Sequence, residues 1–330
     1  MKFRALAAIL VTLSVLLMWG GRAQAQMPTL KVGIPSLSMF TIIYHLAQDK
    51  GFFDKEGVKV EISQFESGSI NMRALVGRAV DVSDVETGLI LGAIANGADL
   101  RVFGTHSQRL HFALYAKKDL KSLADLSGRT FGISGIGGLP HLVILALLER
   151  QNLDPGKVNF VAVGGTGARL SALAGGKIDA TLGEYSPRIE AEPALHRLMV
   201  IAPELPLYMA QGIAAWADTY DAKRDAIERF MRAMVQATRW AYDNKTEMIE
   251  LAAKRLPLPP EQLSKIYDFY VLAQVWAING EISREMLAYM QDLGLKTKTQ
   301  TSEVDLEKLV AEDVYKKNTA ALGVREYPKR

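Results

Sequence analysis

Cysteine is absent from all 330 residues of the chain, and this absence excludes several classes of protein. Without cysteine there is no disulfide framework, no thiol nucleophile and no zinc site built on thiolates. The N-terminal cysteine that anchors bacterial lipoproteins is missing as well. The five histidines do not show the close spacing that is typical of metal ligands. The sequence therefore predicts neither a metal nor another cofactor.

No large excess of either charge is present: 39 lysines and arginines stand against 36 acidic residues, a formal net charge of +3. Lys2, Arg4 and Arg22 all lie in an N-terminal segment that contains no acidic residue. Loss of that segment would lower the formal charge to zero. Because nucleic-acid-binding proteins usually carry a basic face, we expect no nucleic-acid partner.

The N-terminal segment contains an apolar run at residues 5–21, which follows Lys2 and Arg4 and precedes Ala23-Gln24-Ala25. A basic start, an apolar stretch and a small-x-small site are the three parts of a secretory signal. The alternative is a retained membrane anchor, because the run is nearly long enough to span a bilayer. We expect residues 1–25 to be a cleaved signal peptide, with the mature protein free in the periplasm.

Common catalytic and nucleotide-binding motifs are missing too. The stretch GISGI has its second glycine one place too early for the hydrolase pattern Gly-x-Ser-x-Gly. The stretch GGTGARL ends on Leu170 where a dinucleotide-binding motif needs glycine, and the Walker lysine is absent. The sequence therefore favours a protein that is not an enzyme.

One phrase occurs twice in the chain, 98 residues apart. ALVGRAVDVSDVE, residues 74–86, is matched by ALAGGKIDATLGE, residues 172–184. In each copy a helical pattern leads through a glycine to an aspartate and a short strand. The residues around both copies repeat the order strand, helix, strand, helix, strand, which predicts two similar α/β lobes with largely parallel sheets. The expected strands are residues 29–36, 58–63 and 79–85, then 129–134, 157–163 and 177–182.

Two extended apolar segments, residues 103–123 and 200–216, are suited to strands that cross between the lobes. After Trp216 the pattern is helical almost to the end, with Ser283 and Ser302 as candidate helix caps. We expect the chain to return and pack these helices largely on lobe one. The predicted division is residues 26–110 for the first part of lobe one, 111–208 for lobe two and 209–330 for the return to lobe one and the C-terminal helices.

This order of elements resembles the extracytoplasmic solute-binding proteins of bacterial ABC importers, specifically the nitrate, sulfonate and taurine group with its pyrimidine-binding relatives. The resemblance covers essentially the whole mature chain. It implies the type 2 periplasmic binding protein fold, in which two lobes joined by two crossing strands close on a ligand. The stretches that carry it are KVGIPS, AQDKGFFDKEGVKVEI, INMRALVGRAVDVSDV, LADLSGRTFGIS and LSALAGGKIDATL.

Candidate ligand contacts follow the strands, because ligands of open α/β sheets bind beyond the carboxyl ends of the strands. The Gly-rich turn before the helix at 142–152 could offer free amides to an anion. The alternatives are plain turns for the glycines, core positions for Met39 and Phe40, and a simple N-cap for Ser69. The predicted ligand-binding residues are Ser36, Ser38, Met39, Phe40, Ser69, Thr87, His106, Ser134, Gly137, Gly138, His141, Gly165 and Tyr185.

Glu86 and Glu184, which end the two copies of the phrase, leave two interpretations open. A carboxylate in the cleft would repel a sulfonate but welcome an amine of the ligand. The alternative is a structural role as a cap or in a hinge ion pair.

The sequence thus predicts a monomeric periplasmic receptor that binds a small anionic organic molecule, of sulfonate, nitrate, taurine or pyrimidine type. Its expected partner is an ABC permease in the inner membrane. The alternatives are an enzyme on the same fold, resembling a pyrimidine-synthesis relative whose cysteine-rich motif is missing here, and a sensory module that reports to a membrane kinase.

Overall fold

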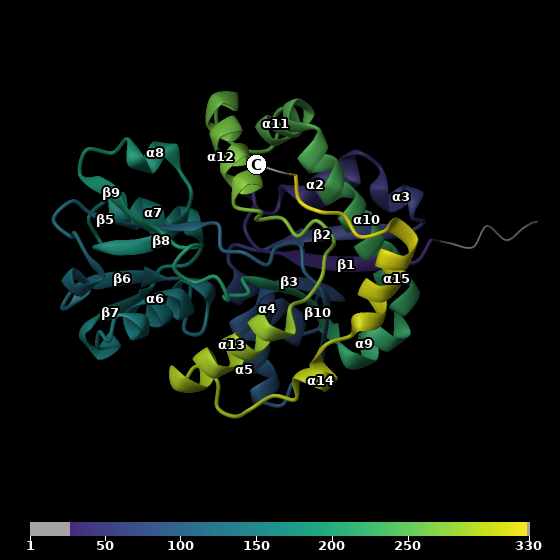
Figure 1. Cartoon of the computed structure of the whole chain (residues 1–330), viewed down its shortest axis with the longest axis horizontal. Coiled ribbons are helices and arrows are strands. Elements are labelled where there is room, and N and C mark those ends of the chain that lie inside the picture. Colours follow the sequence, from purple (N-terminus) through teal and green to yellow (C-terminus); the bar gives the residue numbers. More distant parts are fainter. Residues whose placement is uncertain (1–26, 329–330) are drawn as a thin grey trace, which may run out of the picture.

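The chain forms two α/β lobes, each built around its own five-stranded sheet. The structure is a computed structural model that describes residues 27–328, so the expected signal peptide lies outside the described residues. Figure 1 shows the two lobes side by side, with the C-terminal helices gathered around one of them. Within residues 27–328, no helix is long and apolar enough to span a bilayer.

Both sheets have the same topology. The strand order is β2-β1-β3-β10-β4 in lobe one and β7-β6-β8-β5-β9 in lobe two. The strands of lobe one are β1 Thr29–Ile34, β2 Lys59–Gln64, β3 Val82–Glu86, β4 Leu100–Gly104 and β10 Gln211–Trp216. Those of lobe two are β5 Phe112–Lys117, β6 Thr130–Ile133, β7 Asn159–Ala162, β8 Ala180–Glu184 and β9 Leu195–Val200.

The first three strands of each sheet are parallel, as their helical connections predict. The fourth position is different: β10 and β5 run antiparallel to both of their neighbours. Each of these strands comes directly after a segment in which the chain crosses from the other lobe: residues 105–111 precede β5, and residues 201–210 precede β10. The local pattern correctly predicted mostly parallel sheets and crossing strands within residues 103–123 and 200–216, but it did not show that β5 and β10 would be inserted antiparallel to their neighbours.

The aspartate of the repeated phrase holds the strands of each sheet in place. An Asp81 carboxylate oxygen accepts a 2.8 Å hydrogen bond from the backbone N–H of Lys31, just inside β1. The Asp179 carboxylate accepts the same bond, at 2.9 Å, from the backbone N–H of Thr130 in β6. Each aspartate also pairs with a lysine, Lys223 or Lys117, at 2.7 Å. The phrase recurs because both sheets need the same connection between a helix and its neighbouring strand.

Helices cover both sheets. The pattern predicts a helix that ends just before Gly51, and α2 (Ile42–Asp49) does end there. A second, short helix, α3 (Phe52–Lys55), follows Gly51, whose φ of +70° suits glycine. Ser69 is not the N-cap of the next helix: α4 begins at Gly68, and the Ser67 side chain accepts from the Ile70 N–H. The helices of this part of the chain are α2 Ile42–Asp49, α3 Phe52–Lys55, α4 Gly68–Val76, α5 Thr87–Ala95, α6 Leu139–Arg150, α7 Thr166–Ala174 and α8 Pro187–Glu190, with 3-10 turns at Leu123–Leu126 and Pro155–Lys157.

The C-terminal helices pack mainly on lobe one, as expected. The long helix α10 buries one apolar face against α2 and α3, and α15 packs on β4 and α10. Ser283 caps its helix as predicted, whereas the helix predicted to start at Ser302 begins later and is capped by Asp305. The helices are α9 Ala217–Ala222, α10 Arg224–Asp243, α11 Lys245–Ala253, α12 Pro260–Leu272, α13 Arg284–Lys296, α14 Leu306–Leu309 and α15 Glu312–Leu322.

Candidate functional site

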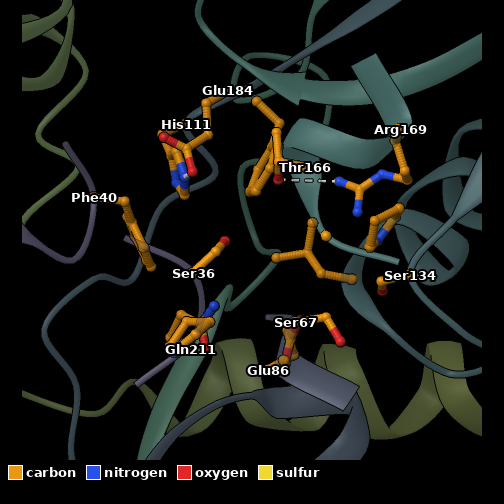
Figure 2. A pocket seen from close by; sticks show the side chains of 16 residues that line it. Ser36, Phe40, Ser67, Glu86, His111, Ser134, Thr166, Arg169, Glu184 and Gln211 are labelled. Atoms are coloured by element: carbon orange, nitrogen blue, oxygen red, sulfur yellow. Dashed lines mark hydrogen bonds and ion pairs between the residues drawn. The ribbon is translucent and has the colours of Figure 1, made fainter. Parts of the chain in front are cut away.

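A cavity lies between the two lobes, at the carboxyl ends of their central strands. Its inner chamber has a volume of about 40 Å³, and an outer chamber of about 530 Å³ adjoins it. Ser36, Gly165, Thr166 and Glu184 line both chambers. The labelled side chains of Figure 2 line the inner chamber and come from both lobes: Ser36, Phe40, Ser67, Glu86, His111, Ser134, Thr166, Arg169, Glu184 and Gln211.

The loop that carries Ser36 and Phe40 is held by hydrogen bonds on both sides. The Thr41 hydroxyl donates to the backbone oxygen of Ser36 at 3.1 Å. The indole N–H of Trp276, a fully buried residue of the C-terminal region, donates to the backbone oxygen of Phe40 at 3.3 Å. The Phe40 ring stacks on the His111 imidazole, with ring centres 4.0 Å apart. This wall of the cavity is therefore held by contacts within the chain itself.

Glu86 and Glu184, the last residues of β3 and β8, enter the inner chamber from opposite lobes. They hold the same place in the two copies of the repeated phrase. Figure 2 shows their carboxyl groups on opposite sides of the chamber. The equivalent strands β3 and β8 therefore both end in a glutamate that faces the chamber.

Glu86 is almost fully buried, at 7% exposure. Burial raises the pKa of its carboxyl to about 7, and nearby Asp84 adds to the rise while Arg169 opposes it. Its Oε2 has no hydrogen-bond partner. The carboxyl lies against the first residue of α4, where a Cβ on Gly68 would come within 2.1 Å of it. Glycine at position 68 is therefore required for this arrangement.

Glu184 lies in a similar environment but keeps some access to the cavity, with 19% of its side chain exposed. Burial raises the pKa of this carboxyl to about 7, and hydrogen bonds from Ser38 and Tyr270 and the charge of Arg169 oppose the rise. The Tyr270 hydroxyl donates to Oε2 at 3.4 Å. His111 Nε2 lies 4.0 Å from Oε1, and burial lowers the pKa of His111 well below its usual value.

Arg169, on α7, brings a buried positive charge to the chamber, at 2% exposure. Four of the five N–H groups of a guanidinium are used here. Nη1 donates to the backbone oxygen of Gly164 at 2.6 Å, and Nε donates to the Thr181 hydroxyl at 3.2 Å. Nη2 donates to the Thr166 hydroxyl and the backbone oxygen of Leu182, both at 3.2 Å. Arg169 therefore mainly fastens α7 to β8.

Asn71 occupies the matching place in lobe one, 98 residues before Arg169. Its side-chain N–H donates to the backbone oxygen of Asp84 at 2.8 Å, and its Oδ1 accepts from the Ser83 hydroxyl at 2.5 Å. Ser83 matches Thr181, the hydroxyl partner of Arg169. Each lobe thus has an equivalent hydrogen-bond network, but only the network of lobe two contains a cationic side chain.

A buried polar pair lies behind the chamber, where the chain leaves lobe one. His106 Nδ1 is 2.8 Å from an Asp84 carboxylate oxygen, and both side chains are at most 1% exposed. Tyr44 is fully buried nearby, and its pKa is raised well above the usual value by burial and by Asp84. His106 therefore belongs to the core beneath the crossing segment and does not line the cavity.

Several predicted site residues do line the cavity. Ser36, Phe40, Ser134 and Gly165 line the inner chamber. The outer chamber is lined by Ser36, Ser38, Met39, Gly165 and Tyr185. Met39 is only 2% exposed and packs mainly in the core of lobe one.

The other predicted residues line neither chamber: Ser69, Thr87, His106, Gly137, Gly138 and His141. The turn expected to offer amides uses two of them itself. The Gly137 N–H donates to His141 Nδ1 at 3.1 Å, and the Gly138 N–H donates to the backbone oxygen of Gly135 at 3.1 Å. His141, 7% exposed, therefore holds the turn together. The backbone N–H groups of Gly137 and Gly138, which were expected to bind an anion, already donate hydrogen bonds within the turn.

Some of these residues meet the opposite lobe instead. A Cβ on Gly138 would lie 3.3 Å from the Ser69 hydroxyl, and one on Gly135 would lie 3.0 Å from it. A Cβ on Gly88 would come within 1.9 Å of the Leu142 side chain, and one on Gly165 within 2.3 Å of the Glu66 backbone oxygen. The lobes therefore touch in this structure, and glycine allows the contact.

Several residues that complete the chamber were not among the predicted ligand-binding residues. Gln211 comes from the crossing strand β10, directly opposite Glu86 in the sheet register. Thr166 and Arg169 come from the start of α7, and His111 from the other crossing segment. The repeated phrase could have identified Arg169, because its counterpart Asn71 stands at the same offset from the shared glutamate.

These contacts do not favour the anionic solute expected from the sequence. Two buried carboxyl groups oppose a negative charge in the chamber, and the nearby guanidinium has one N–H left to offer. Across residues 27–328, no group of three histidine or acidic side chains is placed to hold a metal ion.

Glu86→Gln is expected to raise the free energy of unfolding at pH 8, and much less at pH 5. The carboxyl has a pKa of about 7 when folded, against a usual value of 4.5. The folded state binds this proton more tightly, so the stability it contributes is complete below pH 4.5 and is lost as the pH rises to 7. Glutamine mimics the protonated form. Urea unfolding should show a gain of about 1–3 kcal/mol at pH 8.

Glu192→Gln is the matched control, because Glu192 is exposed on lobe two. Its effect should be within about 0.5 kcal/mol at both pH values. Equal stability of Glu86→Gln and the unmodified chain at pH 8 would contradict the buried, proton-binding state of Glu86.

Comparison with protein families gives a match over much of the chain: residues 38–248 match the family described as NMT1/THI5 like. The protein YtlA of Bacillus subtilis (strain 168) is 25% identical over 262 residues, which cover 73% of this chain and 75% of YtlA.

Among the solved structures that share the fold are two binding proteins. The alkanesulfonate-binding protein SsuA of Xanthomonas axonopodis pv. citri, bound to MOPS, has a TM-score of 0.73 at 18% identity, covering 87% of this chain and 99% of SsuA. The periplasmic nitrate-binding protein NrtA of Synechocystis PCC 6803 has a TM-score of 0.74 at 16% identity, covering 91% of this chain and 90% of NrtA. At these identities the likeness shows the periplasmic binding protein fold.

Proposed function

The chain belongs to the NMT1/THI5-like family, and from this premise we propose that it is an extracytoplasmic solute-binding receptor of an ABC importer. It captures a small organic molecule between its lobes and delivers it to a permease in the inner membrane. The observation that carries the proposal is the cavity itself, whose walls come from both lobes at the carboxyl ends of β3 and β8. Small-molecule sites lie at such positions in α/β folds.

The lobe contacts support closure around the solute. Four glycines, at positions 88, 135, 138 and 165, lie where one lobe meets the other. Two crossing segments connect the lobes, which is the arrangement that hinge closure needs. We propose the same division of the chain as expected from the sequence: residues 26–110 for the first part of lobe one, 111–208 for lobe two, and 209–330 for the return to lobe one and the C-terminal helices.

The proposed location is the periplasm, reached through a signal peptide at residues 1–25 that is then removed. The mature chain has no cysteine for a lipid anchor and a formal charge of zero, and we propose that it works as a monomer. The SsuA and NrtA structures, whose names give binding roles, support a receptor over an enzyme. Recovery of an ABC permease with the protein would support transport, whereas recovery of a membrane kinase would support sensing.

The test begins with native mass spectrometry of protein purified from the periplasm without unfolding. We expect a bound organic molecule that is lost after unfolding and refolding. Adding the identified molecule back should reduce the radius of gyration in solution scattering, because the lobes close on it. Scattering curves that stay identical with and without that molecule, or a crystal structure that places it outside the interlobe cavity, would refute the proposal.

A further inference from the structure

The inner chamber contains hydrogen-bond acceptors that nothing in the described chain satisfies. Glu86 Oε2 and Gln211 Oε1 are both buried and lack a hydrogen-bond partner. Their residues lie directly opposite each other on β3 and β10. A buried acceptor left unpaired costs about 1–3 kcal/mol. A solute that presents N–H donors to this wall would remove that cost.

The formal charges of the chamber point in the same direction. Glu86 and Glu184 face it from opposite lobes, and the positive charge of Arg169 acts on both of them. With both carboxyl groups ionised, these three side chains sum to one negative charge. Because most guanidinium N–H groups of Arg169 are already donated within lobe two, it cannot clamp an anion with two parallel hydrogen bonds. A solute with one positive charge would balance the chamber.

The outer chamber has a different character. Apolar and aromatic side chains dominate its walls and come from both lobes and from the α11–α12 region, among them Leu37, Phe65, Tyr185, Leu256, Leu258 and Ile266. Tyr185 is held in place by stacking on Phe269, with ring centres 5.0 Å apart. The inner chamber is too small for more than a polar head group, so the body of a solute would extend into this apolar space.

We propose that the solute is an organic monocation, with an ammonium or amidinium group held between Glu86 and Glu184 and an apolar body in the outer chamber. This inference rests on the proposed receptor function and specifies the chemical class of its solute. The N–H groups of the cation donate to Glu86, Gln211 and Glu184. The aromatic and aliphatic walls exclude water from its body.

Binding of a cation is then coupled to loss of a proton. Burial raises the pKa of both Glu86 and Glu184 to about 7, so the empty chamber holds a proton near neutral pH. The other titratable groups that face the two acids are Asp84 and Tyr208 beside Glu86, Tyr270 and His111 beside Glu184, and Arg169 between them. A cation held between both ionised carboxylates should bind about a hundredfold more tightly at pH 8 than at pH 6, because the ionised fraction of each rises about tenfold.

Three probes with the same ring separate the charge classes: benzamidine is a cation, benzamide is neutral and benzenesulfonate is an anion. Refolded, solute-free protein is heated with each probe at pH 8. At 10 mM, benzamidine should raise the unfolding temperature by about 2 °C or more, and the other two should leave it unchanged. Glu86→Gln and Glu184→Gln should each lose the shift, while Glu192→Gln should keep it.

The outcomes also distinguish this inference from the receptor function. A shift with benzenesulfonate, or no shift with benzamidine, overturns the cation inference. The receptor function is judged separately, by the molecule found in native mass spectrometry and by closure in scattering. A shift with benzamidine that survives both glutamine substitutions overturns the proposed placement of the cation.

Discussion

Replacing Arg169 with alanine is expected to lower the free energy of unfolding by about 3–5 kcal/mol. The substitution removes a buried guanidinium that donates to the backbone oxygens of Gly164 and Leu182 and to the hydroxyls of Thr166 and Thr181. All four acceptors would lose this donor, those of Thr181 and Leu182 in the buried interior, and Glu86 and Glu184 would lose a nearby positive charge. Urea unfolding at pH 7 measures the loss.

Arg129→Ala is the matched control, because Arg129 also lies in lobe two but its ion pair with Asp119 is exposed at 41% and 55%. Such a pair contributes about 0–1 kcal/mol. If the Arg169 and Arg129 variants lost the same small amount of stability, Arg169 would not be the fastening between α7 and β8 that its hydrogen bonds indicate.

Gly165→Ala is expected to weaken binding of the co-purified solute about 10- to 100-fold without unfolding the protein. Gly165 has a φ of −65° and a ψ of 168°, which alanine adopts without strain. The added Cβ would lie 2.3 Å from the backbone oxygen of Glu66 in the opposite lobe. A backbone oxygen can move only if the chain around it shifts, so the clash destabilises the arrangement in which the lobes touch, by about 1–3 kcal/mol. The arrangement with separated lobes is unaffected.

The dissociation constant of the solute found by native mass spectrometry measures this effect, together with the radius of gyration of the solute-saturated protein. Gly92→Ala is the control, because Gly92 lines neither chamber and its Cβ would make only an ordinary contact, 3.5 Å from the backbone oxygen of Thr299. Unchanged affinity in Gly165→Ala would show that the contact between Gly165 and Glu66 is not needed in the bound state.

Much of the fold could be predicted from the sequence because its signals are local. Alternating apolar residues and the repeated phrase indicated two similar lobes. The structure explains why the phrase is repeated: its aspartate, Asp81 or Asp179, accepts a hydrogen bond from the neighbouring strand in each sheet. Helix ends were less certain, because several polar residues near a start compete for the cap. Ser67 and Asp305 take the roles that the pattern gave to Ser69 and Ser302.

The site was predicted only in part, since it is assembled from segments that are distant in the chain. Ser36, Phe40, Ser134 and Gly165 follow their strands, so the rule for α/β sheets predicted their place at the cavity. Gln211 enters on a strand that crosses from the other lobe, and no local pattern places it beside Glu86. His141 looked available beside the Gly-rich turn, but its imidazole accepts a hydrogen bond from that turn.

The sequence by itself determined the two-lobed α/β architecture, the absence of thiol chemistry and the matching acids at Glu86 and Glu184, because these depend on composition and short-range pattern. Only the tertiary structure decided the charge of the cavity. Whether a carboxyl or a guanidinium acts on a solute depends on burial and on which partners already occupy its hydrogen bonds. Those partners lie on other elements, as the bonds of Arg169 and the unpaired oxygen of Glu86 show.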